Sequence, residues 1–108
     1  MKNAIIMCAA GMSSSLMAKK TTQYLKEKGY DIQVDATIAA TGQKLIKDQK
    51  YDLYLISPQA KMYYEKLKVI ADKADRPMTV IPMQAYAPIP MGIEKLANII
   101  LEYNDEEK

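Results

Sequence analysis

The one cysteine of the chain, Cys8, lies between an apolar run, residues 4–7, and a short loop that leads into a helical pattern. This order predicts a strand, a tight loop and a helix, with the sulfur at the C-terminal end of the strand. Backbone N–H groups at a helix N-terminus lack intrahelical partners and carry a partial positive charge. Such a position favours a thiolate and, even more, a bound phosphoryl group. A buried structural thiol is the alternative for a lone cysteine at a strand end.

The loop after Cys8 has the composition of an anion cradle without a cation. No charged side chain occurs between residues 3 and 18, so a phosphate would depend on backbone N–H groups and serine hydroxyls. Glycine adopts the positive φ that turns successive N–H groups inward. The expected phosphate-binding residues are Ala10, Gly11, Met12, Ser13, Ser14 and Ser15.

Composition excludes several classes of protein. The 108 residues suit one domain, residues 1–108, and the net charge of +2 comes from scattered lysines with a single arginine, which argues against nucleic-acid binding. The chain has no histidine, no pair of cysteines and no Gly-Lys-Ser/Thr sequence, so no histidine metal site, internal disulfide or Walker loop is expected. No apolar segment approaches the roughly 20 residues that cross a bilayer. We therefore expect a cytoplasmic protein, a monomer, without a cofactor.

Four short apolar runs alternate with helical patterns along the chain. The second run alternates apolar and polar residues, as in an edge strand, whereas the first and third are almost wholly apolar, as in central strands. The predicted fold is α/β: a small doubly wound, four-stranded parallel sheet of order 2-1-3-4 with helices on both faces, flavodoxin-like or phosphatase-like. The predicted strands are residues 3–7, 31–37, 52–56 and 78–81, and the helices are residues 13–28, residues 41–49, one capped by Ser57 and one starting near Gly92.

The predicted strand order places a ligand site at the C-terminal ends of the first and third strands, where the connections diverge. Cys8 would lie there, with Ser57, Pro58 and Gln59 beside it and Tyr86 in a neighbouring wall. Ser57 and Pro58 could equally be a helix cap and first turn, and Tyr86 a packed core residue. Helical spacing further predicts that Leu16 and Tyr63 face inward, and residues 104–108 are expected to fray.

From Cys8 to Leu16 the sequence Cys-Ala-Ala-Gly-Met-Ser-Ser-Ser-Leu resembles the enzyme IIB components of the bacterial sugar phosphotransferase system. The resemblance is to the lactose/cellobiose class and, within it, to the cellobiose or diacetylchitobiose type. Ser57-Pro58-Gln59 stands where the family often has Gly-Pro-Gln, and Tyr86 is a weaker third match. Family members often carry an acidic residue and a glycine shortly after this tyrosine, whereas this chain continues Ala-Pro-Ile-Pro-Met-Gly.

The resemblance implies a phosphotransferase that works as a phosphoryl carrier. Cys8 would be the nucleophile and phosphorylation site, taking the phosphoryl group from a phosphohistidine on a IIA partner. The group would pass to a sugar, such as the β-linked disaccharide cellobiose, bound in a membrane-embedded IIC partner, which would bring this protein to the membrane surface. Chitobiose, lichenan fragments and lactose are equally open as sugars.

Other functions found on this fold depend on residues that this chain does not have at the corresponding positions. A phosphatase of the low-molecular-weight class needs an arginine six residues after the cysteine, where this chain has Ser14, so the guanidinium fork is missing. Arsenate reduction of that type fails for the same reason. A receiver domain needs carboxylates at the strand ends, where Cys8 and Ser57 stand. An FMN carrier stays open as an alternative, because the same loop could hold the phosphate of the cofactor, although the chain has no Trp or Phe to stack on the flavin ring. A partner-binding module without chemistry remains open.

Overall fold

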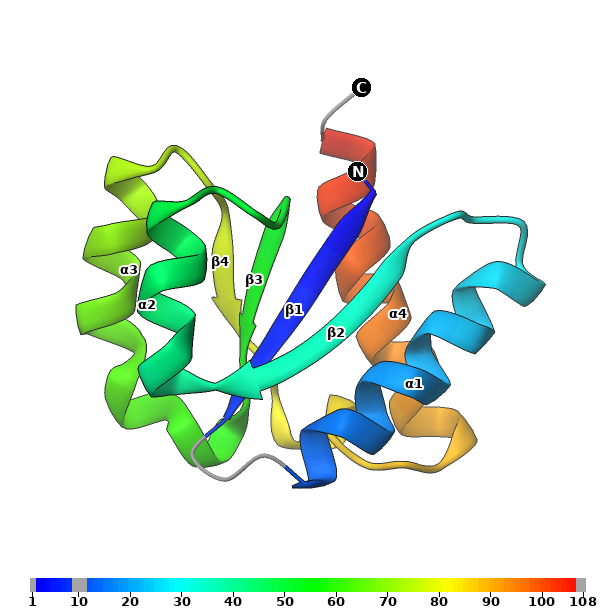
Figure 1. The fold of residues 1–108 in the computed structure, drawn as a ribbon. Helices are drawn as coiled ribbons and strands as arrows, with labels where there is room; N and C mark the ends of the chain where they lie inside the picture. The colour runs from blue at the N-terminus through cyan, green and yellow to red at the C-terminus, as the bar shows by residue number, and fades with distance from the viewer. Residues whose placement is uncertain (1, 9–11, 107–108) are drawn as a thin grey trace.

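A computed structural model of the chain describes residues 2–8 and 12–106, without the side chains of residues 12–14 and 104–106. Strands and helices alternate from one end of the chain to the other (Figure 1). The elements are β1 (Asn3–Cys8), α1 (Met12–Glu27), β2 (Gln33–Ile38), α2 (Ala39–Lys47), β3 (Leu53–Ile56), the 3-10 helix η1 (Pro58–Tyr63), α3 (Tyr64–Lys73), β4 (Met78–Val80), the 3-10 turn η2 (Met83–Ala85) and α4 (Pro90–Glu106).

The four strands form one parallel sheet of order β2-β1-β3-β4, which confirms the predicted topology. The apolar strand β1 pairs with β2 on one side and β3 on the other, and its side chains pack into a hydrophobic core on each face of the sheet. Strand β3 is likewise fully buried, while β2 lies at the edge. Polar residues therefore alternate with apolar ones in β2, which water can reach, and this alternation is absent from β1 and β3, which water cannot reach.

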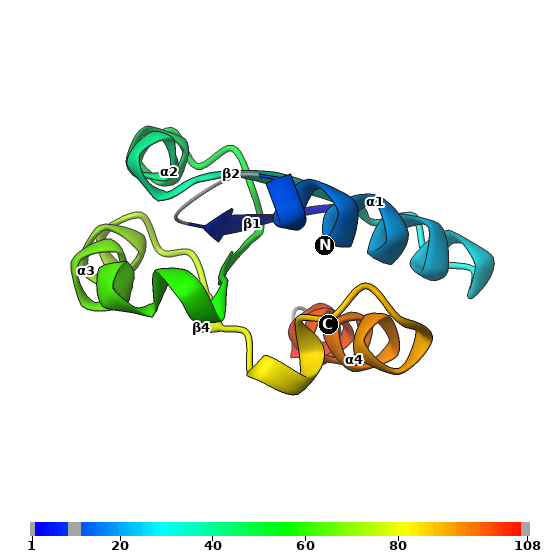
Figure 2. The same ribbon diagram turned by 90° about the horizontal axis from the view of Figure 1, so that it is seen from below.

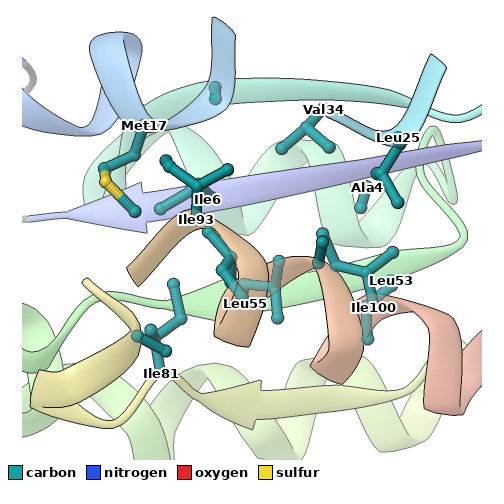
Figure 3. Close-up of a cluster of buried hydrophobic side chains, with 14 of the residues drawn as sticks. Ala4, Ile6, Met17, Leu25, Val34, Leu53, Leu55, Ile81, Ile93 and Ile100 are labelled. Atoms are coloured by element: carbon teal, nitrogen blue, oxygen red, sulfur yellow. The ribbon is translucent and has the colours of Figure 1, made fainter. Parts of the chain in front are cut away.

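Two helices cover each face of the sheet, α2 and α3 on one side and α1 and α4 on the other (Figure 2). Side chains of β1 alternate between the two resulting cores: Ala4 and Ile6 face α1 and α4, while Ile5 and Met7 face α2 and α3. Figure 3 shows Ile6 among side chains from α1 and α4 in the first core. The buried side chains labelled there are Ala4, Ile6, Met17, Leu25, Val34, Leu53, Leu55, Ile81, Ile93 and Ile100.

The free edge of β2 is covered at its centre by a threonine from α1. The Gln33 N–H donates to the Lys2 carbonyl, so the backbone groups of Gln33 point toward β1. Because these directions alternate along a strand, the N–H and carbonyl of Val34 point away from β1. The Thr22 hydroxyl accepts the Val34 N–H at 2.9 Å and lies 3.1 Å from the Val34 carbonyl oxygen. The hydroxyl has one proton to donate, and the Ala18 carbonyl oxygen lies closer to it, at 2.8 Å. The Thr22 side chain thus satisfies the Val34 N–H, a donor that an edge strand would otherwise offer to another strand.

The structure corrects several expectations about the helices. Helix α4 starts at Pro90, two residues before Gly92, and continues through residue 106, so the expected fraying of residues 104–106 is wrong; residues 107–108 lie outside the described part. The Ser57 side chain makes no capping hydrogen bond, and a 3-10 turn separates it from α3. Leu16 and Tyr63 are exposed. The buried side of α1 is formed by Met17, Thr21 and Leu25, and Leu16 lies on the other side of this helix. Tyr63 ends the 3-10 helix η1, where α-helical spacing does not apply.

Two tyrosines form hydrogen bonds to neighbouring segments at the end of the sheet opposite Cys8. The Tyr51 hydroxyl donates to Asp35 of β2 at 2.7 Å, and the Tyr54 hydroxyl donates to the Leu45 carbonyl at 2.9 Å. The two rings pack edge to face with centroids 6.2 Å apart. Burial, together with the hydrogen bond to Asp35, raises the pKa of Tyr51 to about 12 from 10.0. Because the folded state holds this proton more tightly, Tyr51 stabilises the fold fully below pH 10 and loses that contribution as the pH rises toward 12.

We expect Tyr51→Phe to lower the free energy of unfolding by about 1 kcal/mol near neutral pH, since one hydrogen bond is lost. The difference from the wild type should shrink at about pH 11, because only the wild type has this proton to lose on unfolding. Urea unfolding near neutral pH and at about pH 11 measures the difference in free energy of unfolding between the variant and the wild type. Tyr30→Phe, at an exposed position, is the control. A difference that stays constant with pH would contradict the role assigned to the Tyr51 proton.

Candidate functional site

Cys8 is the last residue of the central strand and is 2% exposed. Its main chain pairs with Ile38 at the end of β2, while the preceding residue, Met7, pairs with Ile56 at the end of β3. Since odd-numbered residues of β1 face α2 and α3, the even-numbered Cys8 faces α1 and α4. The predicted position of the sulfur at the C-terminal end of the first strand is therefore confirmed.

Helix α1 begins at Met12, four residues after Cys8, at the same edge of the sheet where β1 ends (Figure 1). The N–H groups of the first turn of an α-helix have no partner within the helix, and in the described part of α1 they belong to residues 12–14. No acidic residue lies in this first turn to compete for them. The arrangement provides an electropositive helix end next to the strand that carries Cys8. Of the predicted cradle, Ala10 and Gly11 lie outside the described residues, and Ser15 is exposed on α1.

Ser57 is the immediate neighbour of Cys8 on the next strand. Its N–H donates to the Met7 carbonyl at 2.9 Å, which continues the pairing of β1 with β3 by one residue. Ser57 is fully buried, and its hydroxyl has no hydrogen-bond partner among the described residues. Pro58 and Gln59 follow in the first turn of η1, with Gln59 exposed. The structure therefore brings Ser57 next to Cys8.

Tyr86 follows η2, on the side of the sheet that Cys8 faces. Its ring packs, half-buried, against the core formed with α1 and α4. The short turn η2 positions it, because the Tyr86 N–H donates to the Met83 carbonyl at 3.1 Å. The packed-core interpretation accounts for the ring.

A feature that sequence reasoning missed is an apolar rim around this edge of the sheet. Of the nine large hydrophobic side chains that are exposed in the described part of the chain, seven lie in segments that start or end at the edge of Cys8. Helical periodicity could not identify them, because it assigns Leu16 and Tyr63 to the core. The residues of the rim are Leu16, Ile38, Met62, Tyr63, Met83, Ile89 and Met91.

The rim also lacks acidic residues. Its segments, residues 12–20, 36–43, 57–64 and 81–93, contain lysines but neither Asp nor Glu. Lys19 and Lys20 on α1 and Lys61 in η1 are all exposed. An anionic group that approaches Cys8 along this surface therefore meets apolar side chains, ammonium groups and a helix N-terminus, and no carboxylate from these segments.

Fold and site together define a small doubly wound α/β protein with a cysteine at a strand–helix junction, beside the N-terminus of α1. A family model described as "PTS system, Lactose/Cellobiose specific IIB subunit" matches residues 3–100. The chain belongs to this family, the IIB components of the lactose/cellobiose type, which are sugar-specific parts of the phosphotransferase system. Membership implies phosphoryl transfer in sugar uptake.

Characterised relatives carry the same kind of name with different sugars. The chain is 36% identical over 88 residues to the oligo-β-mannoside-specific EIIB component of Bacillus subtilis, covering 80% of this chain and 82% of that one. It is 34% identical to the galactose-specific EIIB component of Lactococcus lactis subsp. cremoris, covering 73% and 76%. It is 33% identical to the cellobiose-specific EIIB component of Lactococcus lactis subsp. lactis, again covering 73% and 76%.

Two solved structures share the fold. The lactose-specific IIB domain from Streptococcus pneumoniae superposes with a TM-score of 0.80 at 18% identity, covering 94% of this chain and 95% of that one. The cellobiose-specific IIB component from Borrelia burgdorferi gives a TM-score of 0.73 at 22% identity, covering 96% and 92%. In the part of this chain that the structure describes, no helix has the length and apolar character needed to span a membrane.

Proposed function

We propose that the chain is a phosphoryl carrier that accepts its phosphoryl group on Cys8. The donor is a phosphohistidine on a IIA protein, and the acceptor is a sugar held by a membrane IIC transporter, at whose cytoplasmic surface the single domain of residues 1–108 works. The observation that carries this proposal is the position of Cys8 at the end of the buried strand β1, beside the N-terminus of α1.

The chemistry that this geometry supports is two successive displacements at phosphorus. The Cys8 thiolate attacks the phosphorus, an S–P bond forms, the N–P bond breaks, and its electron pair returns to the imidazole of the donor. A sugar hydroxyl then attacks the phosphorus and gives its proton to a base of the transporter, while the S–P bond breaks and its electron pair returns to the Cys8 thiolate. Helix N–H groups stabilise the oxygens in both steps without supplying a proton. The chain has no histidine, so the histidine of the first step must come from the partner.

The apolar rim supports a protein donor over a small-molecule donor. Cys8 is 2% exposed, so the donor must approach closely around the strand end where the rim lies. Apolar side chains surrounding a reactive group are typical of a protein interface, and the absence of acidic residues suits a phosphorylated partner. We infer that the IIA protein docks on this rim.

The names of the relatives bear on the class of sugar. Relatives of similar identity to this chain are named for an oligo-β-mannoside, galactose and cellobiose, so identity by itself does not select one sugar. Two of these three names denote β-linked saccharides. A β-linked disaccharide such as cellobiose is therefore the substrate class we propose.

Cys8→Ser should abolish phosphoryl acceptance, because an alcohol at this position replaces the one thiol of the chain. The measurement is intact mass after incubation with phosphoenolpyruvate, the general phosphotransferase proteins and a IIA protein. The wild type should gain one phosphoryl group and the variant none, with unchanged circular dichroism. A phosphorylated Cys8→Ser variant, or a wild type that none of several IIA proteins can phosphorylate, would overturn the carrier assignment.

Met83→Glu should slow phosphoryl acceptance about tenfold at low ionic strength, since a carboxylate on the rim repels a phosphorylated donor. Met83→Lys removes the same apolar surface without that repulsion and should be slowed less. Initial rates at low donor concentration and two salt concentrations measure both, with Val69→Glu as the control on the exposed face of α3, outside the rim. Equal rates for the two Met83 variants would show that charge on the rim plays no part in docking.

A further inference from the structure

We propose that the Ser57 hydroxyl donates a hydrogen bond to the phosphoryl group on Cys8, an inference that rests on the carrier function proposed above. The observation behind it is an unsatisfied polar group. Ser57 is 0% exposed, and its Oγ has no hydrogen-bond partner among the described residues. A buried hydroxyl without a hydrogen-bond partner lowers the stability of the fold. Its position beside the reactive sulfur indicates that a group bound to the sulfur forms the missing hydrogen bond.

The strand register places this hydroxyl on the same face of the sheet as the Cys8 sulfur. In β3, Leu53 and Leu55 face α1 and α4, whereas Tyr54 and Ile56 face α2 and α3. Ser57 retains an extended backbone, with φ −66° and ψ 155°, so the alternation continues and its side chain falls on the face of Leu55.

Cys8 lies on that same face of β1, one residue beyond the pair Met7 and Ile56. Neighbouring strands are about 4.8 Å apart, so the two side chains project side by side from adjacent strand ends. The Ser57 Oγ forms no hydrogen bond to the unmodified sulfur. A phosphoryl group on Cys8 extends beyond the sulfur and carries three acceptor oxygens, which can reach a donor that the thiol does not.

A neutral donor at this position suits a carrier. The loop after Cys8 contains no cation, so hydrogen bonds must hold the phosphoryl group during its stay on the protein. In the transfer from the donor, the S–P bond forms while the N–P bond breaks, and the Ser57 O–H would hydrogen-bond one non-bridging oxygen without giving up its proton. This bond holds the phosphoryl group on Cys8 until a sugar hydroxyl attacks.

The inference predicts opposite effects of Ser57→Ala on stability and on phosphoryl binding. Loss of an unsatisfied hydroxyl should leave the unphosphorylated protein as stable as the wild type or more stable. The phosphorylated protein should lose one hydrogen bond to a charged group, which corresponds to about a tenfold to hundredfold change in an equilibrium constant. A purely structural serine would lower stability and phosphoryl binding together.

The experiment is a competition for one phosphoryl group. Phosphorylated wild type is mixed with an equal amount of unphosphorylated Ser57→Ala and a trace of IIA protein, and intact masses give the distribution at equilibrium. We expect at least tenfold preference for the wild type. Thr21→Val is the matched control, because Thr21 is also fully buried and its hydroxyl also has no partner among the described residues, but it lies in the middle of α1. The phosphoryl group should be distributed equally between this variant and the wild type.

Ser57→Gly, which also removes the hydroxyl, is measured beside Ser57→Ala, together with the thermal unfolding of each unphosphorylated variant. An equal distribution between the wild type and both Ser57 variants would overturn this inference while leaving the carrier function intact. A preference that appears only together with a large loss of thermal stability would also overturn it, in favour of a structural role. A wild type that accepts no phosphoryl group would remove the carrier function and this inference together.

Discussion

The parallel hydrogen bonding of β1 between β2 and β3 is the constraint on which the rest of the structure depends. These bonds cover both edges of β1, and the helices on each side of the sheet cover its two faces, so every side chain from Ala4 to Cys8 is at most 2% exposed. A strand held in this way cannot shift by one residue without exchanging the contents of the two cores. Its last residue therefore has a defined position and a defined face, and that residue is Cys8.

The site uses backbone where many phosphoryl-transfer proteins use charged side chains. A guanidinium would stabilise both the bound group and the transition state of its hydrolysis, and position 14, where a phosphatase would carry it, is a serine. In the function proposed above, helix N–H groups and hydroxyls bind the phosphoryl group without providing a base for water. That proposal assigns the histidine to the donor and the sugar to the transporter, and it agrees with membership of the IIB family.

Sequence reasoning recovered the fold because each signal had a single physical cause. The run before Cys8 is apolar since β1 is buried on both faces, and Gly29 follows α1 with φ +90°, a conformation that other residues avoid. The same reasoning failed for Leu16 because the sheet covers the side of α1 that carries Met17, Thr21 and Leu25, and Leu16 lies on the other side. It failed for Tyr63 because α-helical spacing does not extend into the 3-10 helix η1. It left Ser57 open between a helix cap and a position beside Cys8, since the unsatisfied state of a hydroxyl depends on register and burial that only coordinates show.

The hydroxyl of Thr22 on the free edge of β2 has a consequence for how the protein behaves in a crowded cell. A carrier must leave each partner as readily as it meets it, and edge-to-edge association of sheets would trap copies of the chain in long-lived aggregates. Because the Val34 N–H is already bonded within the molecule, an incoming strand would have to displace a buried side chain before it could add to the sheet. The threonine thus works as a gatekeeper against self-association, and it leaves the opposite end of the fold, around Cys8, available for transient encounters.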